Sequence, residues 1–254
     1  MPQPCAESLV DVDFLTRSAG ADPTLDVALP HALLDLVVTG ARRPVLRCYR
    51  PRATVAFGRR DTFLPGFASA AAAAHRQGFT PVIRGAGGRA AAYDEGCLIF
   101  DEIMPADGSQ IRERFAQDAG RQAHALQQLG VDARVGEVPG EYCPGEFSVN
   151  ARGRVKLIGA AERIVKGGWL HSSVVVVEGA LRLRAVLEAV YAALAIDWDP
   201  DSVGAVRDEA PGAGLDEVRQ ALLAEYATRY TLWPRALSEA DLSRTGELLA
   251  RHRV

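Results

Sequence analysis

Apolar residues recur at helical spacing in several stretches of the chain. After Asp22-Pro23-Thr24, leucines and alanines follow three and four positions apart until Gly40, which predicts a capped helix. The same spacing predicts helices over 68–77, 111–129, 181–194, 215–230 and 238–250. A stretch rich in proline, aspartate and glycine, 197–214, predicts a loop.

Short runs of β-branched and aromatic residues predict strands between these helices. They cover 45–49, 54–57, 81–84, 97–103, 132–135, 155–164 and 169–177, and 147–149 leads into a turn at 150–153. Strands and helices do not alternate strictly, so we predict an α+β fold with a mixed β-sheet flanked by helices. We expect one catalytic domain over 1–254, with a core of about 22–195 and a helical C-terminal extension of about 196–254.

Composition and charge exclude several classes of partner. The 254 residues include 29 Lys and Arg against 32 Asp and Glu, so the net charge of −3 argues against a nucleic-acid-binding surface. Residues 1–20 carry acids and no continuous apolar run, and no stretch has membrane-spanning length. We expect a cytoplasmic protein with no membrane partner. The four cysteines have no metal-site spacing, so we expect neither a metal nor a disulfide scaffold.

Small residues dominate the segment from Arg84 to Gly96, Arg-Gly-Ala-Gly-Gly-Arg-Ala-Ala-Ala-Tyr-Asp-Glu-Gly. A backbone with so little side-chain bulk can approach a ligand closely and turn its N–H groups toward it. With Arg84 and Arg89, it would suit a carboxylate, a phosphate or a polarised acyl carbonyl. The segment matches neither common glycine-rich nucleotide motif, and tight strand packing is the alternative interpretation.

Cys143 stands in Glu141-Tyr-Cys-Pro-Gly-Glu146, where Pro-Gly forces a turn that can present a side chain at a cleft. A thiol attacks an acyl carbon only as the thiolate, so it needs a nearby cation or base. Lys156 lies 13 residues later on the following hairpin, among apolar neighbours that would lower its pKa. The alternatives are a buried small cysteine and an outward-facing lysine.

The remaining cysteines and histidines give weaker signals. Cys48 and Cys97 lie in apolar strands and Cys5 near the N-terminus, so all three are interpreted as non-catalytic. His171 could reach the same pocket from its strand, although a packed histidine is the more common role.

Three segments in this order resemble the lipoate-protein ligase and octanoyltransferase family, whose domain biotin protein ligases share. They are Arg84 to Gly96, Cys143-Pro144-Gly145, and Gly153-Arg-Val-Lys156-Leu-Ile-Gly159 with Glu162-Arg163; Thr54-Val-Ala-Phe-Gly-Arg59 resembles an early strand of the family. The resemblance covers about 22–191. The chain departs from common family patterns at Ala86, Arg89, Tyr93, Ile158, Ala160 and Glu162.

The resemblance implies a biotinyl/lipoyl protein ligase catalytic domain with an acyl pocket. It implies that the glycine loop surrounds the acyl group and that Lys156 contacts the acyl carbonyl. The Tyr-Cys-Pro-Gly-Glu stretch is most similar to the branch with a cysteine nucleophile. The catalytic candidates are Cys143 and Lys156, and the substrate-binding candidates are Arg84, Gly85, Ala86, Gly87, Gly88, Arg89, Ala90, Tyr93, Gly159, Ala160 and His171.

We therefore predict an acyltransferase that moves an octanoyl or lipoyl group onto a protein lysine through a thioester on Cys143. Lys156 would help to deprotonate the thiol, and backbone N–H groups near Gly87, Gly88 or Cys143 would bind the oxyanion. The donor would be acyl carrier protein or glycine cleavage H protein, the acceptor a lipoyl domain, and no cofactor would be needed. Two alternatives remain: an ATP- and Mg-dependent lipoate-protein ligase, and a non-catalytic acyl-binding or regulatory protein on the same fold.

Overall fold

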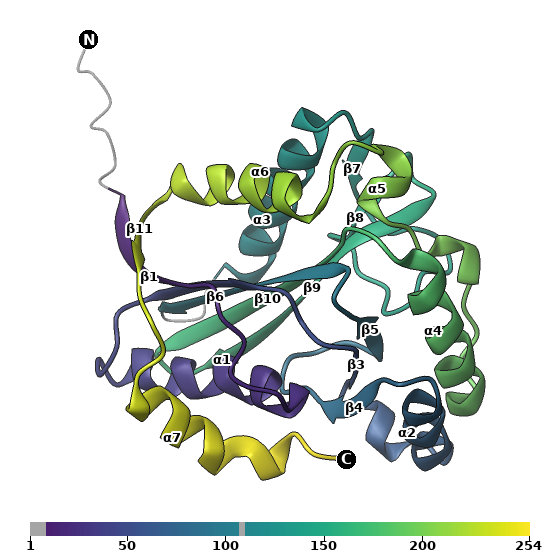
Figure 1. Ribbon diagram of the computed structural model, residues 1–254, viewed down its shortest axis with the longest axis horizontal. Coiled ribbons are helices and arrows are strands. Elements are labelled where there is room, and N and C mark those ends of the chain that lie inside the picture. Colours follow the sequence, from purple (N-terminus) through teal and green to yellow (C-terminus); the bar gives the residue numbers. More distant parts are fainter. Residues whose placement is uncertain (1–8, 107–109) are drawn as a thin grey trace.

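Two β-sheets form the frame of the protein, as the computed structural model shows for residues 9–106 and 110–254 (Figure 1). The larger sheet has eight strands in the order β11-β1-β2-β6-β10-β9-β8-β7, and the smaller has three in the order β4-β3-β5. The strands of the large sheet are β1 (Val10–Leu15), β2 (Val45–Tyr49), β6 (Cys97–Pro105), β7 (Ala133–Val135), β8 (Val149–Ala151), β9 (Val155–Val165), β10 (Gly168–Val176) and β11 (Tyr230–Pro234). The small sheet consists of β3 (Thr54–Phe57), β4 (Thr80–Ile83) and β5 (Ala91–Tyr93).

Helices cover both faces of the large sheet and one side of the small one (Figure 1). The helices α3 and α6 lie on one face of the large sheet and α1 and α7 on the other, while α2 and α4 pack together beside the small sheet. The helices are α1 (Pro23–Val38), α2 (Phe67–Arg76), α3 (Ile111–Gln128), α4 (Ala180–Leu194), α5 (Val206–Glu209), α6 (Leu215–Ala227) and α7 (Glu239–Leu248). The mixed sheets with flanking helices confirm the predicted fold class.

Helix α1 illustrates how the local sequence produces this arrangement. The Asp22 carboxylate caps the helix by accepting the Thr24 N–H at 2.9 Å, and Pro23 occupies the first turn, where no N–H is needed. Its leucines and alanines are buried against the sheet, including Leu29 and Leu33. This apolar face holds the N-terminal half of α1 over the region where the candidate site lies.

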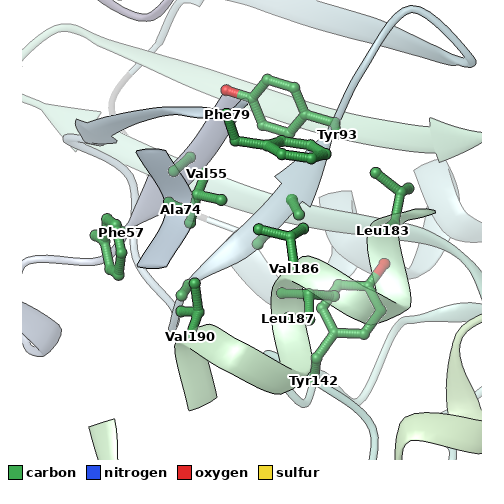
Figure 2. Close-up of a cluster of buried hydrophobic side chains, with 14 of the residues drawn as sticks. Val55, Phe57, Ala74, Phe79, Tyr93, Tyr142, Leu183, Val186, Leu187 and Val190 are labelled. Atoms are coloured by element: carbon green, nitrogen blue, oxygen red, sulfur yellow. The ribbon is translucent and has the colours of Figure 1, made fainter. Parts of the chain in front are cut away.

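The small sheet and α4 share a continuous hydrophobic core. Figure 2 shows Val55 and Phe57 of β3 with Leu183, Leu187 and Val190 of α4 in this cluster. Tyr142, which precedes the candidate nucleophile, is buried in the same cluster (Figure 2). The turn that carries Cys143 is therefore anchored in the core next to it.

Most elements lie where the hydrophobic pattern predicts them, but four strands do not. Strands β1 and β11 were not predicted, β5 lies inside the predicted glycine-rich loop, and β8 occupies part of the predicted turn at 150–153. The predicted helix 215–230 ends at Ala227, because Tyr230 begins β11 and pairs with Val10 of β1. These strands depend on partners distant in sequence, which short-range periodicity does not report.

The C-terminal residues return to the small sheet and contact the strand that leads into the glycine loop. The Ile83 N–H donates to the His252 carbonyl at 2.9 Å, and Val82 forms an isolated bridge with Arg253. Because Arg84 follows Ile83 directly in the sequence, this pairing places His252 beside Arg84. Among the described residues, no helix combines the length and apolar character that crossing a membrane requires.

Candidate active site

A cavity of about 690 Å³ lies between the small sheet and the large sheet. Small and apolar side chains make much of its wall, among them Ala56, Ala92 and Val174. Cys143 and Lys156 also line it, together with part of the glycine loop. A deep apolar cavity with a few polar groups at one place is the usual form of a small-molecule or acyl site.

The Cys143 sulfur lies at the wall of this cavity, against the glycine loop. Its Sγ accepts hydrogen bonds from Arg84 Nη2 at 3.2 Å and from the Arg89 backbone N–H at 3.3 Å. Cys143 has a φ of +44°, a left-handed conformation that is uncommon for a residue with a side chain. Strain of this kind is found at functional sites, where the surrounding structure maintains it.

The electrostatic surroundings favour the thiolate form of Cys143. Burial by itself raises the pKa of this thiol. The positive charges of Arg84 and Lys156, with the Arg89 N–H, outweigh burial, so the pKa lies below that of an ordinary cysteine. A larger fraction of Cys143 is thus nucleophilic at neutral pH than of a free thiol.

The ammonium of Lys156 is directed at the cysteine turn and not at the sulfur itself. Its Nζ donates to Glu141 Oε1 at 3.1 Å and to the carbonyl oxygens of Tyr142 and Cys143 at 3.2 and 2.8 Å. An ammonium has three protons, and these three bonds use all of them. Lys156 therefore holds the turn that carries the thiol and adds positive charge near the sulfur. The cation in contact with the sulfur is Arg84.

Glu141 organises the same turn from inside. Its Oε1 accepts from the Gly145 N–H at 2.9 Å, the Ser148 hydroxyl at 2.6 Å and Lys156 Nζ, and its Oε2 accepts from the Val138 N–H at 3.2 Å. A buried carboxylate with so many donors fixes the conformation of the loop around it. The sequence contains Glu141 within the cysteine segment, but its role depends on donors that only the fold brings together.

Tyr191 of α4 joins the cysteine turn to the glycine loop. Its hydroxyl accepts from the Cys143 N–H at 2.8 Å and donates to the Ala90 carbonyl at 2.9 Å. The Cys143 N–H, one of the oxyanion donors that the sequence suggested, is therefore occupied by Tyr191 in this structure. No sequence signal identified Tyr191, because it lies on the buried face of an ordinary amphipathic helix.

The variant Tyr191→Phe is expected to destabilise the protein by about 1–3 kcal/mol, because it leaves a buried N–H and a buried carbonyl without partners. It should also slow acylation of Cys143 by misplacing the sulfur relative to the loop. Urea unfolding and the rate of thiol acylation measure the two effects. Parent-like values for both would show that this tyrosine does not position the turn.

Gly88 is the residue of the glycine loop that packs against the thiol. A Cβ at this position would lie 2.7 Å from Cys143 Sγ and 2.5 Å from Arg84 Nη2, and Gly88 has a φ of +96°. A side chain there would push the sulfur away from its cation. By contrast, a Cβ on neighbouring Gly87 would meet nothing within 4 Å.

We expect Gly88→Ala to lower the rate of Cys143 acylation by about 10²-fold, as misplacement of a reacting group by about 1 Å does. Gly87→Ala is the matched control, and it should acylate at nearly the parent rate. Quenched time courses of Cys143 acylation by an octanoyl thioester compare the two variants. Equal rates for both would exclude close packing of the sulfur on Gly88.

The structure brings most of the candidate residues together and separates four of them from the cavity. The residues that line the cavity are Arg84, Ala86, Gly87, Gly88, Tyr93, Cys143, Lys156, Gly159 and Ala160. The residues outside its wall are Gly85, Arg89, Ala90 and His171. Gly85 packs against the His31 ring, Ala90 is fully buried, and the Arg89 side chain pairs with Asp61 at 3.1 Å.

His171 belongs to a buried ionic cluster instead. Its Nδ1 lies 3.2 Å from Glu162 Oε1 and its Nε2 3.1 Å from Asp118 Oδ2. Burial lowers the pKa of His171, but the hydrogen bonds to Asp118 and Glu162 outweigh burial and raise it to about 10. The alternative interpretation of a packed histidine describes this residue, which is a charged structural group.

A charged group that the sequence analysis missed lies at another part of the cavity wall. The fully buried Arg47 forms ion pairs with Asp26 and with Asp101, the latter at 3.3 Å, and Asp101 also accepts from the Ser172 hydroxyl at 2.6 Å. Asp26, Asp101 and Ser172 line the cavity. An arginine in the middle of an apolar strand was the available signal, since a buried charge requires partners.

The other cysteines differ clearly from Cys143. Cys48 and Cys97 are buried in β2 and β6, as expected, and burial raises the pKa of each to about 12. Cys5 lies outside the described residues. Over 9–106 and 110–254, no group of His, Cys, Asp and Glu side chains is arranged to hold a metal ion.

The fold and the cavity define the class of this protein: a mixed-sheet domain with a glycine-lined acyl-type cavity. The lipoyl protein ligase A/B catalytic domain matches residues 22–227, and the chain belongs to this family. A lipoate protein ligase from Thermoplasma acidophilum, solved as a bipartite ligase with its E2 lipoyl domain, has the same fold, with a TM-score of 0.75 and 23% identity over 96% of this chain and 93% of that one. A lipoate-protein ligase A solved with ATP has a TM-score of 0.75 and 22% identity, with 95% of each chain covered.

Curated relatives carry one recurring name, octanoyl-[GcvH]:protein N-octanoyltransferase. The relative from Anoxybacillus flavithermus is 32% identical over 68% of this chain and 63% of its own length. The relative from Exiguobacterium sibiricum is 27% identical over 96% of this chain and 90% of its own. The chain spans less than two thirds of several of these relatives, between 46% and 63% of their length.

Proposed function

We propose that this protein transfers an octanoyl or lipoyl group between protein lysines through a thioester on Cys143. The observation that carries this proposal is the Cys143 sulfur in the cavity, hydrogen-bonded to Arg84 and beside Gly88. A partly exposed thiol with a lowered pKa is the form that reactive cysteines take. The names of the relatives, which specify octanoylated GcvH and a protein, agree with this chemistry.

The first step is attack by the Cys143 thiolate on the acyl carbonyl of the donor. The new C–S bond forms, the bond from the acyl carbon to the donor breaks, and the leaving group takes a proton from water. In the second step, the acceptor lysine amine attacks the thioester, the C–S bond breaks, and the thiolate returns as the amine loses a proton. When the donor is an octanoylated lysine, an amide replaces an amide, so the exchange needs no ATP.

Arg84 supports the reaction in two ways under this proposal. Its Nη2 stabilises the thiolate, and its Nε is buried without a hydrogen-bond partner in the part of the chain that the structure describes. A buried, unpaired donor next to the nucleophile is suited to bind the oxyanion of the tetrahedral intermediate. Arg84 would thus replace the backbone N–H of Cys143, which Tyr191 occupies.

The arrangement favours transfer over the ATP-dependent ligase reaction. Arg84 Nη2 donates to Cys143 Sγ and to the Arg89 carbonyl at 2.6 Å, so the guanidinium at the acyl cavity is directed at the thiol. The cysteine would also have no purpose in a reaction that proceeds through an acyl-adenylate. We propose glycine cleavage H protein as the donor and a lipoyl domain as the acceptor.

The decisive assay mixes the protein with octanoylated H protein and an unmodified lipoyl domain, with and without ATP. We expect octanoyl transfer to the lipoyl domain at the same rate in both cases. Octanoylation from free octanoate that depends on ATP and persists in Cys143→Ala would establish a ligase instead. Binding of octanoate without transfer from any donor would establish a non-catalytic protein.

A further inference from the structure

A second cavity, of about 390 Å³, adjoins the start of the glycine loop at Arg84 and Gly85. It is lined by His31, Arg59, Arg163, Arg251 and His252, among others, and these five residues define the basic groove. They come from α1, the segment after β3, β9 and the C-terminal turn. The groove therefore depends on the return of the C-terminal residues to β4.

The charge of the basic groove is uncompensated. The side chains of Arg59, Arg163 and Arg251 are exposed, and none of the three has an ion-pair partner within the described ranges. The one carboxylate on the groove wall, Asp35, is already bound by Arg244, with hydrogen bonds of 3.1 and 2.6 Å. Many other arginines of this protein are paired, so the groove concentrates free positive charge.

Two histidines, His31 and His252, also line the groove. Their rings stack at 5.0 Å between centroids. Burial, then His252, then Arg163 lower the pKa of His31 to about 3. The pKa of His252 is also lowered, by burial and by Arg251, against the opposing hydrogen bond to the Ile83 carbonyl. Both pKa values are shifted toward the neutral imidazole, so the positive charge of the groove comes from its arginines.

The basic groove and the acyl cavity share two lining residues, His31 and Arg84. Arg84 lines both, and its guanidinium is the group in contact with Cys143 Sγ. Gly85 packs directly on the groove side, because a Cβ there would lie 2.6 Å from the His31 ring. A macromolecule in the groove would therefore lie one arginine side chain away from the thioester.

We propose that the basic groove docks the acidic surface of the protein that carries the acceptor lysine. This inference rests on the proposed function, which requires a folded protein to place an amine at Cys143. Exposed arginines from three separate elements suit carboxylates on a protein surface, since charges at an interface rim accelerate encounter and select the partner. Guanidinium groups pair with phosphate oxygens as well as with carboxylates, but the proposed transfer consumes no nucleotide, so a protein carboxylate is the partner that this function requires.

The test uses the double variant Arg163→Glu/Arg251→Glu, with Arg154→Glu as the matched control. Arg154 is an exposed arginine outside the groove, in the β8–β9 turn, without an ion-pair partner among the described residues. Each protein is acylated with an octanoyl thioester of a small thiol, and octanoyl release is then measured with a lipoyl domain and with hydroxylamine. Binding of the unmodified lipoyl domain is measured separately by calorimetry.

We expect the double variant to transfer to the lipoyl domain at least about tenfold more slowly, with weaker binding and a shallower dependence on salt. Acylation and release to hydroxylamine should stay at the parent rate, and Arg154→Glu should match the parent throughout. Unchanged binding and transfer in the double variant would overturn the inference. A defect confined to acylation by octanoylated H protein would overturn it too, because the groove would then serve the donor.

The calorimetry separates this inference from the proposed function. If the parent binds the lipoyl domain and the double variant does not, the docking surface stands even when no acyl group appears on Cys143. If Cys143 is acylated and discharged normally but charge reversal leaves binding intact, only the docking surface is wrong.

Discussion

Replacement of Cys143 by alanine is expected to abolish octanoyl transfer, with a loss of about 10³-fold or more in rate. The reason is chemical: without the sulfur, the acyl group has no covalent position between donor and acceptor. The assay is octanoylation of a lipoyl domain from octanoylated H protein. Because the side chain is small and the turn is held by Glu141, Lys156 and Tyr191, the variant should keep its fold.

Two further cysteine variants serve as controls for this prediction. Cys48→Ala changes a thiol in the core of the sheet, and it should retain transfer after allowance for lost stability. Cys143→Ser keeps a nucleophile with a much higher pKa, and it should be slower by a similar order to alanine. Transfer by Cys143→Ser at the parent rate would contradict a thioester mechanism.

Replacement of Arg84 by methionine is expected to reduce transfer at neutral pH by about 10²-fold. Burial opposes the thiolate and Arg84 is the first of the groups that favour it, so the pKa of Cys143 should rise in the variant. A thiol with a higher pKa ionises only at higher pH, so the rising limb of the acylation rate against pH moves toward alkaline values. The measurement is the pH profile of Cys143 acylation by an octanoyl thioester.

Arg84→Lys distinguishes charge from shape in this prediction. A lysine keeps the positive charge, but it lacks the forked guanidinium whose Nη2 reaches Sγ and whose Nε is unpaired. We expect its pH profile to stay close to that of the parent, while its maximal rate falls because the unpaired donor is gone. A methionine variant with an unshifted profile would show that Arg84 does not stabilise the thiolate.

The features of the site that depend on neighbouring residues could be predicted from the sequence. Asp22 and Pro23 identify the start of α1, and Pro-Gly after Cys143 identifies the turn that places its sulfur at the cavity wall. Small residues from Gly85 to Gly88 identify the loop that packs on the sulfur. These features depend on neighbours in the chain, so a reader of the sequence can recognise them.

The contacts between residues distant in the sequence could not be predicted from the sequence. Arg84 and Cys143 are 59 residues apart, and Tyr191 is 48 residues from the cysteine whose N–H it accepts. Lys156 was correctly placed near the cysteine turn, but its orientation toward backbone carbonyls depends on Glu141 and the register of β8 with β9. Strands β1 and β11 were missed for the same reason, since each is stabilised mainly by pairing with a distant strand.

The most direct test is the intact mass of the protein, quenched in acid seconds after mixing with octanoylated H protein in the absence of ATP. A thioester mechanism predicts a single octanoyl adduct that maps to Cys143, disappears on treatment with hydroxylamine and disappears when a lipoyl domain is added. Transfer to the lipoyl domain without any adduct, or with the adduct on another residue, would contradict it.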